Sequence, residues 1–282
     1  MEIIIGNNSG FCAGVRYTVL KAEDLSNQEK TIYCLGELVH NERIIEDLKK
    51  KGITFKDNIE EIPDKETVII RAHGETKGIN ERASEKNLNI VDLTCGKIRI
   101  IRNKIKEKLK DYSIIIIGKK NHPETIGTKS FSGEDSYTIE TIEDIKEVLK
   151  QVQKNKLYIV AQTTFSSEGF DKIIKEIEKE FTGEILVDKT ICDATEKRQE
   201  ETRELSKEVD KMIIIGGKKS SNTKELYNIS LENQPNTYLI QDVEELKKED
   251  FDKDDRVGVM AGASTPQIVV DEVITFLEKI SK

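Results

Sequence analysis

Short runs of β-branched residues recur along the chain, and stretches with helical periodicity separate them. Ile-rich runs stand at residues 3–5, 114–117 and 213–215, and each of these runs ends in Gly. This pattern is typical of parallel strands buried between two layers of helices, because both faces of such a sheet need apolar side chains. The sequence therefore predicts an α/β fold with mostly parallel sheets.

Helices are expected between these runs, where Ile, Leu and Val recur at helical spacing among Lys and Glu. Seven stretches have this pattern: 14–25, 41–50, 97–110, 169–181, 195–209, 223–231 and 266–280. Charged residues make up 35% of the chain and hydrophobic residues 36%. Long disordered segments are therefore not expected, because the apolar residues are concentrated in short, dense runs.

Similar segments return roughly every hundred residues, which is the sign of repeated architecture. Gly6, Gly118 and Gly216 each end an Ile run, and the segments 90–95 and 186–192 both lead from Val-Asp to a cysteine. We expect three related, pseudo-symmetric α/β units. Their predicted ranges are 1–95, 96–191 and 192–282.

Charge and apolar patterning exclude several classes of protein. The chain has 45 Lys and Arg against 53 Asp and Glu, a net charge of -8, and no tail of like charges. This argues against general nucleic-acid binding. The first residues have no basic segment before an apolar one, and the longest apolar run, 157–161, is far too short to span a membrane. We expect a cytoplasmic protein with no membrane partner.

Four cysteines are widely spaced, and no pair has the C-x-x-C spacing of a local metal site. Cys34 lies within an apolar strand and is predicted to be a core residue. Cys12, Cys95 and Cys192 each follow a predicted strand. Three thiolates that converged on one point would suit zinc or an iron–sulfur cluster. Spacing alone leaves open that they are three unrelated buried cysteines.

The chain's three histidines, His40, His73 and His122, all stand in loops directly after apolar segments. Ligands in open α/β sheets bind beyond the carboxyl ends of the strands, where such loops lie. A cluster of histidines can bind phosphate or carboxylate, because a bound anion favours the cationic imidazole. Histidines are also metal ligands, and their spacing does not separate the two roles.

Hydroxyl and amide side chains open two predicted helices that follow strands. Ser220, Ser221 and Asn222 precede one helix, and Ser264 precedes another. N-capping explains such residues structurally. The same geometry can also hold anionic oxygens through free backbone N–H groups.

Glu124 follows His122 and Pro123 at a predicted helix start. A glutamate there has a structural explanation as well, because the helix dipole stabilises its negative charge. A carboxyl group beside an anion site can have a raised pKa, so Glu124 is the best candidate for a general acid. Thr163 stands just past another strand. It is predicted to relay a proton or to bind a substrate hydroxyl, although a helix cap would explain it as well.

Together these segments resemble the 4-hydroxy-3-methylbut-2-enyl diphosphate reductase family, also called LytB. The resemblance covers essentially the whole chain and rests on nine segments in order: 10–15 (GFCAGV), 37–41 (ELVHN), 71–74 (RAHG), 92–95 (DLTC), 122–124 (HPE), 162–164 (QTT), 191–195 (ICDAT, followed by Arg198 and Gln199), 220–222 (SSN) and 261–264 (AGAS). Each segment is weak by itself. Nine in register are specific.

The resemblance implies three α/β units around one central [4Fe–4S] cluster per chain, with three cysteine ligands and one iron open to substrate. The implied ligands are Cys12, Cys95 and Cys192. It also implies that the diphosphate is held by His40, His73, His122, Ser220, Ser221, Asn222 and Ser264. Glu124 and Thr163 would handle the substrate hydroxyl and the protons.

The implied reaction reduces (E)-4-hydroxy-3-methylbut-2-enyl diphosphate to isopentenyl and dimethylallyl diphosphate, the final step of the non-mevalonate isoprenoid pathway. No G-x-G-x-x-G fingerprint is visible, so ferredoxin or flavodoxin is the expected electron donor. Two other functions stay open: a redox-neutral iron–sulfur hydro-lyase, and a non-catalytic protein with a Cys3His zinc site or a thiol switch.

Overall fold

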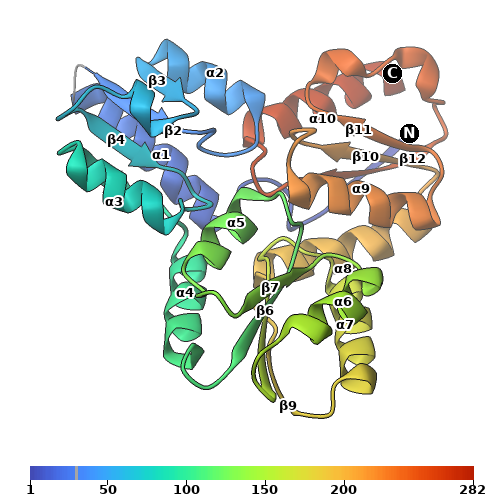
Figure 1. Ribbon diagram of the computed structural model, residues 1–282. Coiled ribbons are helices and arrows are strands. Elements are labelled where there is room, and N and C mark those ends of the chain that lie inside the picture. The colour runs from blue at the N-terminus through green and yellow to red at the C-terminus, as the bar shows by residue number, and fades with distance from the viewer. Residues whose placement is uncertain (29–30) are drawn as a thin grey trace. The chain divides into compact units, whose positions relative to one another are not determined.

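The computed structural model describes residues 1–28 and 31–282 (Figure 1). Within these residues the chain forms three sheets, each of four strands, and every strand pair is parallel. The first sheet has the order β3-β2-β4-β5, the second β7-β6-β8-β9 and the third β1-β12-β10-β11. The predicted α/β class with parallel sheets is confirmed.

The strands are short, with four to six residues each. Their bounds in the first sheet are β2 (Ile32–Leu35), β3 (Ile53–Lys56), β4 (Thr67–Ile70) and β5 (Asn89–Asp92). The second sheet contains β6 (Ser113–Ile117), β7 (Ser136–Ile139), β8 (Lys156–Ala161) and β9 (Glu184–Asp188). The third contains β1 (Glu2–Ile5), β10 (Lys211–Ile215), β11 (Thr237–Ile240) and β12 (Arg256–Ala261).

Helices occupy all seven of the predicted stretches, with ends shifted by a few residues. They are α1 (Ala13–Gln28), α2 (Glu42–Lys50), α4 (Gly96–Lys108), α7 (Ser167–Glu180), α8 (Asp193–Glu208), α9 (Ser221–Asn233) and α10 (Gln267–Ser281). Three shorter helices fall outside those stretches: α3 (Lys77–Glu85), α5 (Pro123–Ser130) and α6 (Ile145–Gln151).

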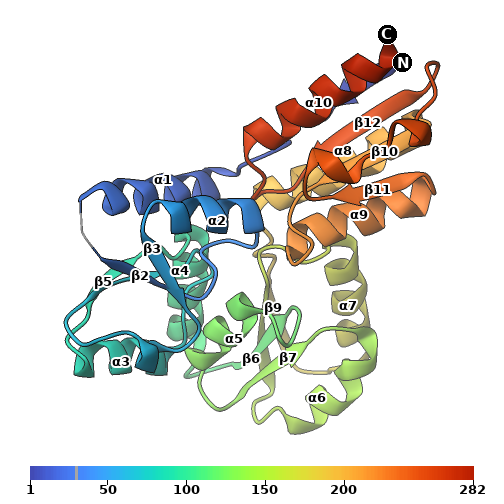
Figure 2. The ribbon, with the colours of Figure 1, turned by 90° about the horizontal axis from the view of Figure 1, so that it is seen from above.

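Each sheet is covered on both faces, as its apolar pattern requires. In the third sheet, β10 turns Ile213 and Ile215 toward Val273 of α10, and Ile214 toward Leu205 of α8. Figure 2 shows α10 on one side of this sheet and α8 and α9 on the other. Successive side chains of a strand point to opposite faces, so uninterrupted Ile runs are buried on both sides.

Internal packing divides the described chain into two compact units. The first unit comprises residues 1–17, 39–47 and 193–282 and contains the third sheet. The second unit comprises residues 18–38 and 48–192 and contains the other two sheets. The boundaries expected near residues 95 and 192 stay a prediction, and β1 hydrogen-bonds to β12 rather than to a strand of the first sheet.

One predicted equivalence between the repeats is wrong. The Ile run that ends at Gly6 was matched with β6 and β10, but β1 is an edge strand, whereas β6 and β10 lie inside their sheets. Their true counterpart is β2. Gly36, Gly118 and Gly216 follow β2, β6 and β10, and each donates its N–H to the carbonyl of the last residue of the neighbouring edge strand, at 2.8, 2.9 and 2.8 Å.

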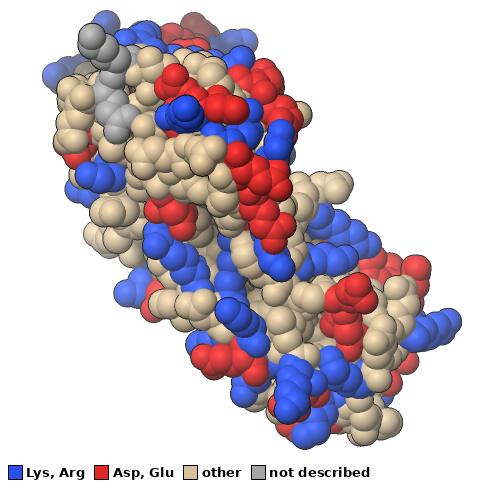
Figure 3. Space-filling model, turned by 60° about the vertical axis from the view of Figure 1, so that its left-hand side comes forward, with Lys and Arg blue, Asp and Glu red and all other residues tan. Residues whose placement is uncertain are grey.

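Charged side chains are numerous on the surface. Figure 3 draws one face, on which basic and acidic side chains are interspersed. In the part of the chain that the structure describes, no helix has the length and apolar character needed to cross a bilayer.

Candidate active site

The three predicted metal ligands occupy one equivalent backbone position. Each cysteine follows an edge strand of its sheet. Its backbone N–H donates to a carbonyl just beyond the neighbouring strand, two residues after that strand ends. The three pairs are Cys12 to Ala263 at 3.1 Å, Cys95 to Ala72 at 2.9 Å and Cys192 to Thr163 at 3.0 Å. This repeated hydrogen bond fixes each cysteine beyond the carboxyl ends of its sheet, where parallel sheets bind their ligands.

Each of these cysteines directly precedes a helix of at least 13 residues, namely α1, α4 or α8. The N-terminus of a helix carries positive partial charge, which suits the binding of negatively charged groups. The Cys12 sulfur accepts the N–H of Val15 at 3.4 Å, so it caps α1. All three thiols are partly exposed.

Cys34 differs from the other three cysteines. It lies in the middle of the first sheet and is fully buried, as predicted. Burial raises the pKa of its thiol to about 12. A thiol that resists ionisation in this way is a poor metal ligand, so Cys34 belongs to the core.

The helix after each cysteine covers the next sheet along the chain. α4 follows the first sheet and packs Ile105 on the second. α8 follows the second sheet and packs Leu205 on the third. α1 follows β1 of the third sheet. Its Thr18 hydroxyl donates to the carbonyl of Leu93, next to the first sheet, at a distance of 3.4 Å. Along the chain, each cysteine therefore stands between the edge strand of one sheet and the helix that packs on the next sheet.

Two side chains of α8 hold the loop that carries Cys12. Arg198 is buried and donates to the Gly10 carbonyl at 2.7 Å. The Glu201 carboxylate accepts the N–H groups of Asn7 and Asn8 at 2.6 and 2.8 Å. The position of this loop therefore depends on α8, a helix far away in the sequence.

His73 and His122 lie against each other in the second unit. Their ring centroids are 5.4 Å apart, with the rings nearly perpendicular. His122 caps α5, and its Nδ1 accepts the N–H of Glu124 at 3.2 Å. This hydrogen bond places the proton of a neutral His122 on Nε2, which is therefore the donor atom of the ring.

Glu124 lies in the first turn of α5 and is almost fully buried, with 3% exposure. Its Oε1 accepts the backbone N–H of Thr163 at 2.6 Å, and its Oε2 accepts the Thr163 hydroxyl at 2.7 Å. Burial raises the pKa of Glu124, although the hydrogen bonds from Thr163 and the positive charge of Arg102 oppose the rise. A carboxyl group with a raised pKa can carry a proton where an exposed glutamate would not.

Arg102 of α4 connects the His73 segment with α5. Its guanidinium donates to the carbonyls of Glu75 and His73 at 3.1 and 3.4 Å. Gly74 and Gly127 leave the space for it, because a Cβ at either position would lie within 2.8 Å of its Nη2. Burial lowers the pKa of Arg102, while the charges of Glu124, Asp92 and Glu75 oppose that shift.

Contacts within the second unit connect six of the predicted site residues, either directly or through an adjacent residue. The path runs from Cys192 to Thr163, Glu124, His122 and His73, whose preceding residue Ala72 accepts the N–H of Cys95. The structure therefore brings the proposed general acid, two histidines and two cysteines into one contiguous region.

His40 belongs to the first unit. Its carbonyl accepts the Ser264 hydroxyl at 3.4 Å. A Cβ on Gly217 would lie 2.2 Å from the same carbonyl, so the loop after β10 approaches His40 closely because it has glycine there. The three predicted residues Ser220, Ser221 and Asn222 follow this loop and open α9.

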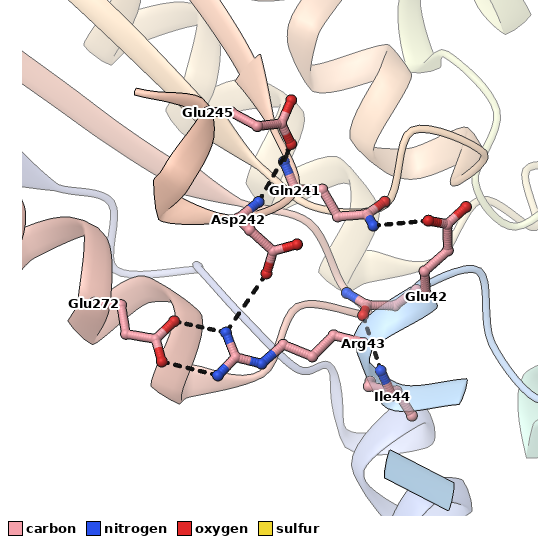
Figure 4. A network of polar contacts seen from close by, with 8 residues as sticks. Glu42, Arg43, Ile44, Gln241, Asp242, Glu245 and Glu272 are labelled. Atoms are coloured by element: carbon pink, nitrogen blue, oxygen red, sulfur yellow. Dashed lines mark hydrogen bonds and ion pairs between the residues drawn. The ribbon is translucent and has the colours of Figure 1, made fainter. Parts of the chain in front are cut away.

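An ion-pair network fixes the His40 segment to the first unit (Figure 4). Arg43 binds Glu272 of α10 through two hydrogen bonds of 2.6 and 2.8 Å, and its Nη1 lies 3.5 Å from Asp242. Beside this pair, Gln241 donates to Glu42 at 3.0 Å. The start of α2 is therefore anchored on the third sheet's unit.

The α9 terminus has an unusual buried amide. Ser220 caps the helix by accepting the Thr223 N–H at 3.3 Å, as predicted. Asn222 is 3% exposed, and neither its side-chain nitrogen nor its oxygen has a hydrogen-bond partner in the described chain. An unsatisfied buried amide costs about 1–3 kcal/mol, which makes Asn222 a candidate for binding a polar group.

Sequence reasoning missed the residues that position this site. Arg102 is one of six basic residues on α4, and nothing local distinguishes it. Its partners Gly74 and Gly127 lie on other elements, so only the fold shows that they make its cavity. Arg198 lies in a segment that carries the family resemblance, but the sequence assigns it no role.

Known proteins match the sequence along nearly its whole length. The family model described as LytB protein matches residues 3–278. The 4-hydroxy-3-methylbut-2-enyl diphosphate reductase of Aquifex aeolicus is 40% identical, over 99% of this chain and 97% of its own. The reductase of that name from Clostridioides difficile is 38% identical, over 99% of this chain and all of its own.

Solved structures share the fold of this chain. The E-1-hydroxy-2-methyl-but-2-enyl-4-diphosphate reductase of Plasmodium falciparum matches with a TM-score of 0.91 at 29% identity, covering 100% of this chain and 88% of that one. A structure described as (E)-4-hydroxy-3-methyl-but-2-enyl diphosphate reductase, the terminal enzyme of the non-mevalonate pathway, matches with a TM-score of 0.71 at 39% identity, covering 99% of this chain and all of that one. This chain belongs to the LytB family.

Proposed function

We propose that the chain is a reductive dehydroxylase that converts (E)-4-hydroxy-3-methylbut-2-enyl diphosphate to isopentenyl and dimethylallyl diphosphate. The reaction adds two electrons and two protons to the substrate and releases its hydroxyl as water. The observation that carries the proposal is the equivalence of Cys12, Cys95 and Cys192, each fixed by the same hydrogen bond at the start of a long helix.

The cysteine residues fit an iron–sulfur cluster. Their three thiols are partly exposed, lie at helix N-termini and are unlike the inert Cys34. Soft sulfur ligands select iron–sulfur clusters and zinc. A [4Fe–4S] cluster bound to Cys12, Cys95 and Cys192 would supply single electrons and a Lewis-acidic iron with no protein ligand.

The diphosphate would be bound by His40, His73, His122, Ser220, Ser221, Asn222 and Ser264. Support for this comes from the buried Asn222 amide without a protein partner and from the N–H groups at the start of α9. His122 would donate from Nε2, because its Nδ1 is occupied by the Glu124 N–H. Hydrogen-bond donors at a helix start suit anionic oxygens.

Glu124 would deliver protons during the reaction, and Thr163 would hold it in position. The Thr163 hydroxyl is the group through which a proton could pass between Glu124 and a substrate hydroxyl, since it contacts the carboxylate directly. The water-poor surroundings of Glu124 keep its pKa raised. The acid can therefore be protonated at a pH where the diphosphate is anionic.

The test is an anaerobic assay of the iron-loaded protein with the allylic diphosphate and reduced methyl viologen. We expect both C5 diphosphate products, with two electrons consumed for each molecule formed. Loss of water without reductant, which would give a diene diphosphate instead of the two C5 products, would favour a hydro-lyase. A colourless protein that contains zinc and no iron would favour the non-catalytic alternative. A loaded cluster with no C5 product would contradict the proposal.

A further inference from the structure

The three helices that follow the proposed cluster ligands differ sharply in charge. α4, which follows Cys95, has six Lys or Arg and one Glu, a net charge of +5. α1 has two basic and two acidic residues, and α8 has four basic and six acidic. The whole chain carries -8, so α4 is a local exception. The first turn of α4 also has no acidic residue, although a helix N-terminus favours one.

The basic residues of α4 surround an exposed apolar side chain. Ile98, Ile101 and Ile105 form the buried stripe of the helix. On the opposite face Ile100 is 54% exposed. Arg99 and Lys106 lie on one flank of it, two turns apart, and Lys97 and Lys104 lie on the other. Glu107, the one acidic residue of the helix, lies two turns after Ile100 on the same side. The basic face of α4 is defined here as Lys97, Arg99, Ile100, Lys104, Lys106 and the single acidic Glu107.

Part of this charge has no acidic counterpart within the described part of the chain. Lys104 pairs with Asp188 at 2.8 Å. The half-exposed Arg99 donates to the carbonyls of Thr94 and Asp92. Its Nε also lies 3.9 Å from the carboxylate oxygen Oδ2 of Asp92, a long ion pair. Lys106 is exposed and makes no ion pair with residues 1–28 or 31–282. A surface with unmatched positive charge around an apolar centre is complementary to an acidic protein.

We propose that the basic face of α4 docks the electron donor, and that this donor is a small electron-carrier protein with an acidic surface. The inference rests on the proposed function, because a reductive dehydroxylation needs electrons from outside the chain. Ile100 is five residues after Cys95, about 7.5 Å along the helix axis. A carrier seated there has its cofactor close to a proposed cluster ligand, and positive charge accelerates encounter with an acidic partner.

The test compares substitutions on α4 with a matched substitution on α8. Lys106→Glu and the double variant Ile100→Ser with Lys106→Glu change the basic face without facing Asp188. Lys197→Glu is the control. It makes the same change of charge at an exposed position, and Lys197 is five residues after Cys192, as Ile100 is after Cys95. Folding of every variant is checked by its thermal unfolding midpoint.

Two measurements are made on the iron-loaded protein. Titration with a flavodoxin, an acidic carrier, gives the dissociation constant, and basic cytochrome c serves as the probe of opposite charge. Turnover is then driven either by reduced flavodoxin or by reduced methyl viologen, which needs no protein docking surface. Binding is measured at low and at high salt, because exposed charges are screened by added ions.

We expect the double variant to weaken flavodoxin binding about tenfold at low salt and to show a smaller salt dependence. Its turnover with methyl viologen should match wild type, and Lys197→Glu should bind flavodoxin as wild type does. Equal weakening by Lys197→Glu, no preference for flavodoxin over cytochrome c, or parallel loss of methyl viologen turnover would overturn the proposal. Wild type that binds flavodoxin but forms no product with methyl viologen would instead refute the reductase function.

Discussion

Thr163 binds both carboxylate oxygens of Glu124, one through its backbone N–H at 2.6 Å and the other through its hydroxyl at 2.7 Å. The two residues come from different elements around the second sheet. Glu124 lies in the first turn of α5, and Thr163 follows β8. The same Thr163 accepts the N–H of Cys192 through its carbonyl. The candidate general acid is thus fixed to the backbone that positions a candidate cluster ligand.

Replacing Glu124 by Gln should abolish most turnover while leaving the site assembled. The amide has almost the same shape, but it cannot donate a carboxylic proton at neutral pH. We expect a loss of about a hundredfold to ten-thousandfold in kcat. Iron content and diphosphate affinity should stay near wild type. Turnover close to wild type would remove Glu124 from the mechanism.

The raised pKa of Glu124 predicts a pH dependence of stability. Burial favours the protonated form in the folded state, so its contribution is present at low pH and is lost as pH rises through the raised pKa. The loss occurs at pH values above 4.5, the ordinary pKa of a glutamate. The free energy of unfolding should therefore fall more steeply above this pH in wild type than in Glu124→Gln, as measured by urea midpoints. Parallel curves would show that burial does not perturb this carboxyl.

Serine substitutions separate the proposed ligands from the core cysteine. Cys12→Ser, Cys95→Ser and Cys192→Ser should each lose most of the bound iron and the visible absorption of the cluster, because a hydroxyl is a poor soft ligand. Cys34→Ser is the control, since Cys34 is buried within a strand. It should retain the cluster. If one of the first three variants keeps its full iron content, the cysteine replaced in it is not a cluster ligand.

The sequence predicted the fold class and the seven main helices, because these depend on local patterns, while the roles of the functional segments stay a prediction. Apolar runs report burial, and the position of a polar residue just past a strand reports the binding edge of a sheet. The same patterns do not report strand partners. β1 reads as a central strand because of its Ile run, yet it is an edge strand with Ile5 42% exposed.

The positioning residues could not be predicted for a related reason. Arg102 matters because Gly74 and Gly127, from two other elements, leave room for its guanidinium. Arg43 matters because α10 brings Glu272 to it across 229 residues of sequence. Neither relationship has a local signal, since each depends on which elements pack together.

Removing the Arg43 ion pair should destabilise the protein slightly and loosen the anchoring of His40. Arg43 and Glu272 are each about one-third exposed, so we expect Arg43→Met to lower the free energy of unfolding by only about 0.5–1 kcal/mol. If the same energy is lost from diphosphate binding, KM rises roughly twofold to fivefold. Lys51→Met, which breaks an exposed pair with Glu23, is the control and should leave KM unchanged. An unchanged KM in Arg43→Met would mean that this pair does not position His40.

Two glycine-to-alanine changes in helices should have opposite effects on stability. At Gly127 in α5 the new Cβ would lie 2.5 Å from Arg102 Nη2, whose guanidinium is held by two carbonyls. We expect Gly127→Ala to destabilise the protein by about 1–3 kcal/mol. Gly78 in α3 has open space around it, so Gly78→Ala should stabilise by about 0.5–1 kcal/mol through reduced backbone entropy in the unfolded chain. Urea denaturation of both variants gives the comparison. If Gly127→Ala is as stable as Gly78→Ala, then Arg102 can leave its cavity without cost, and its role in holding the His73 segment beside Glu124 is lost.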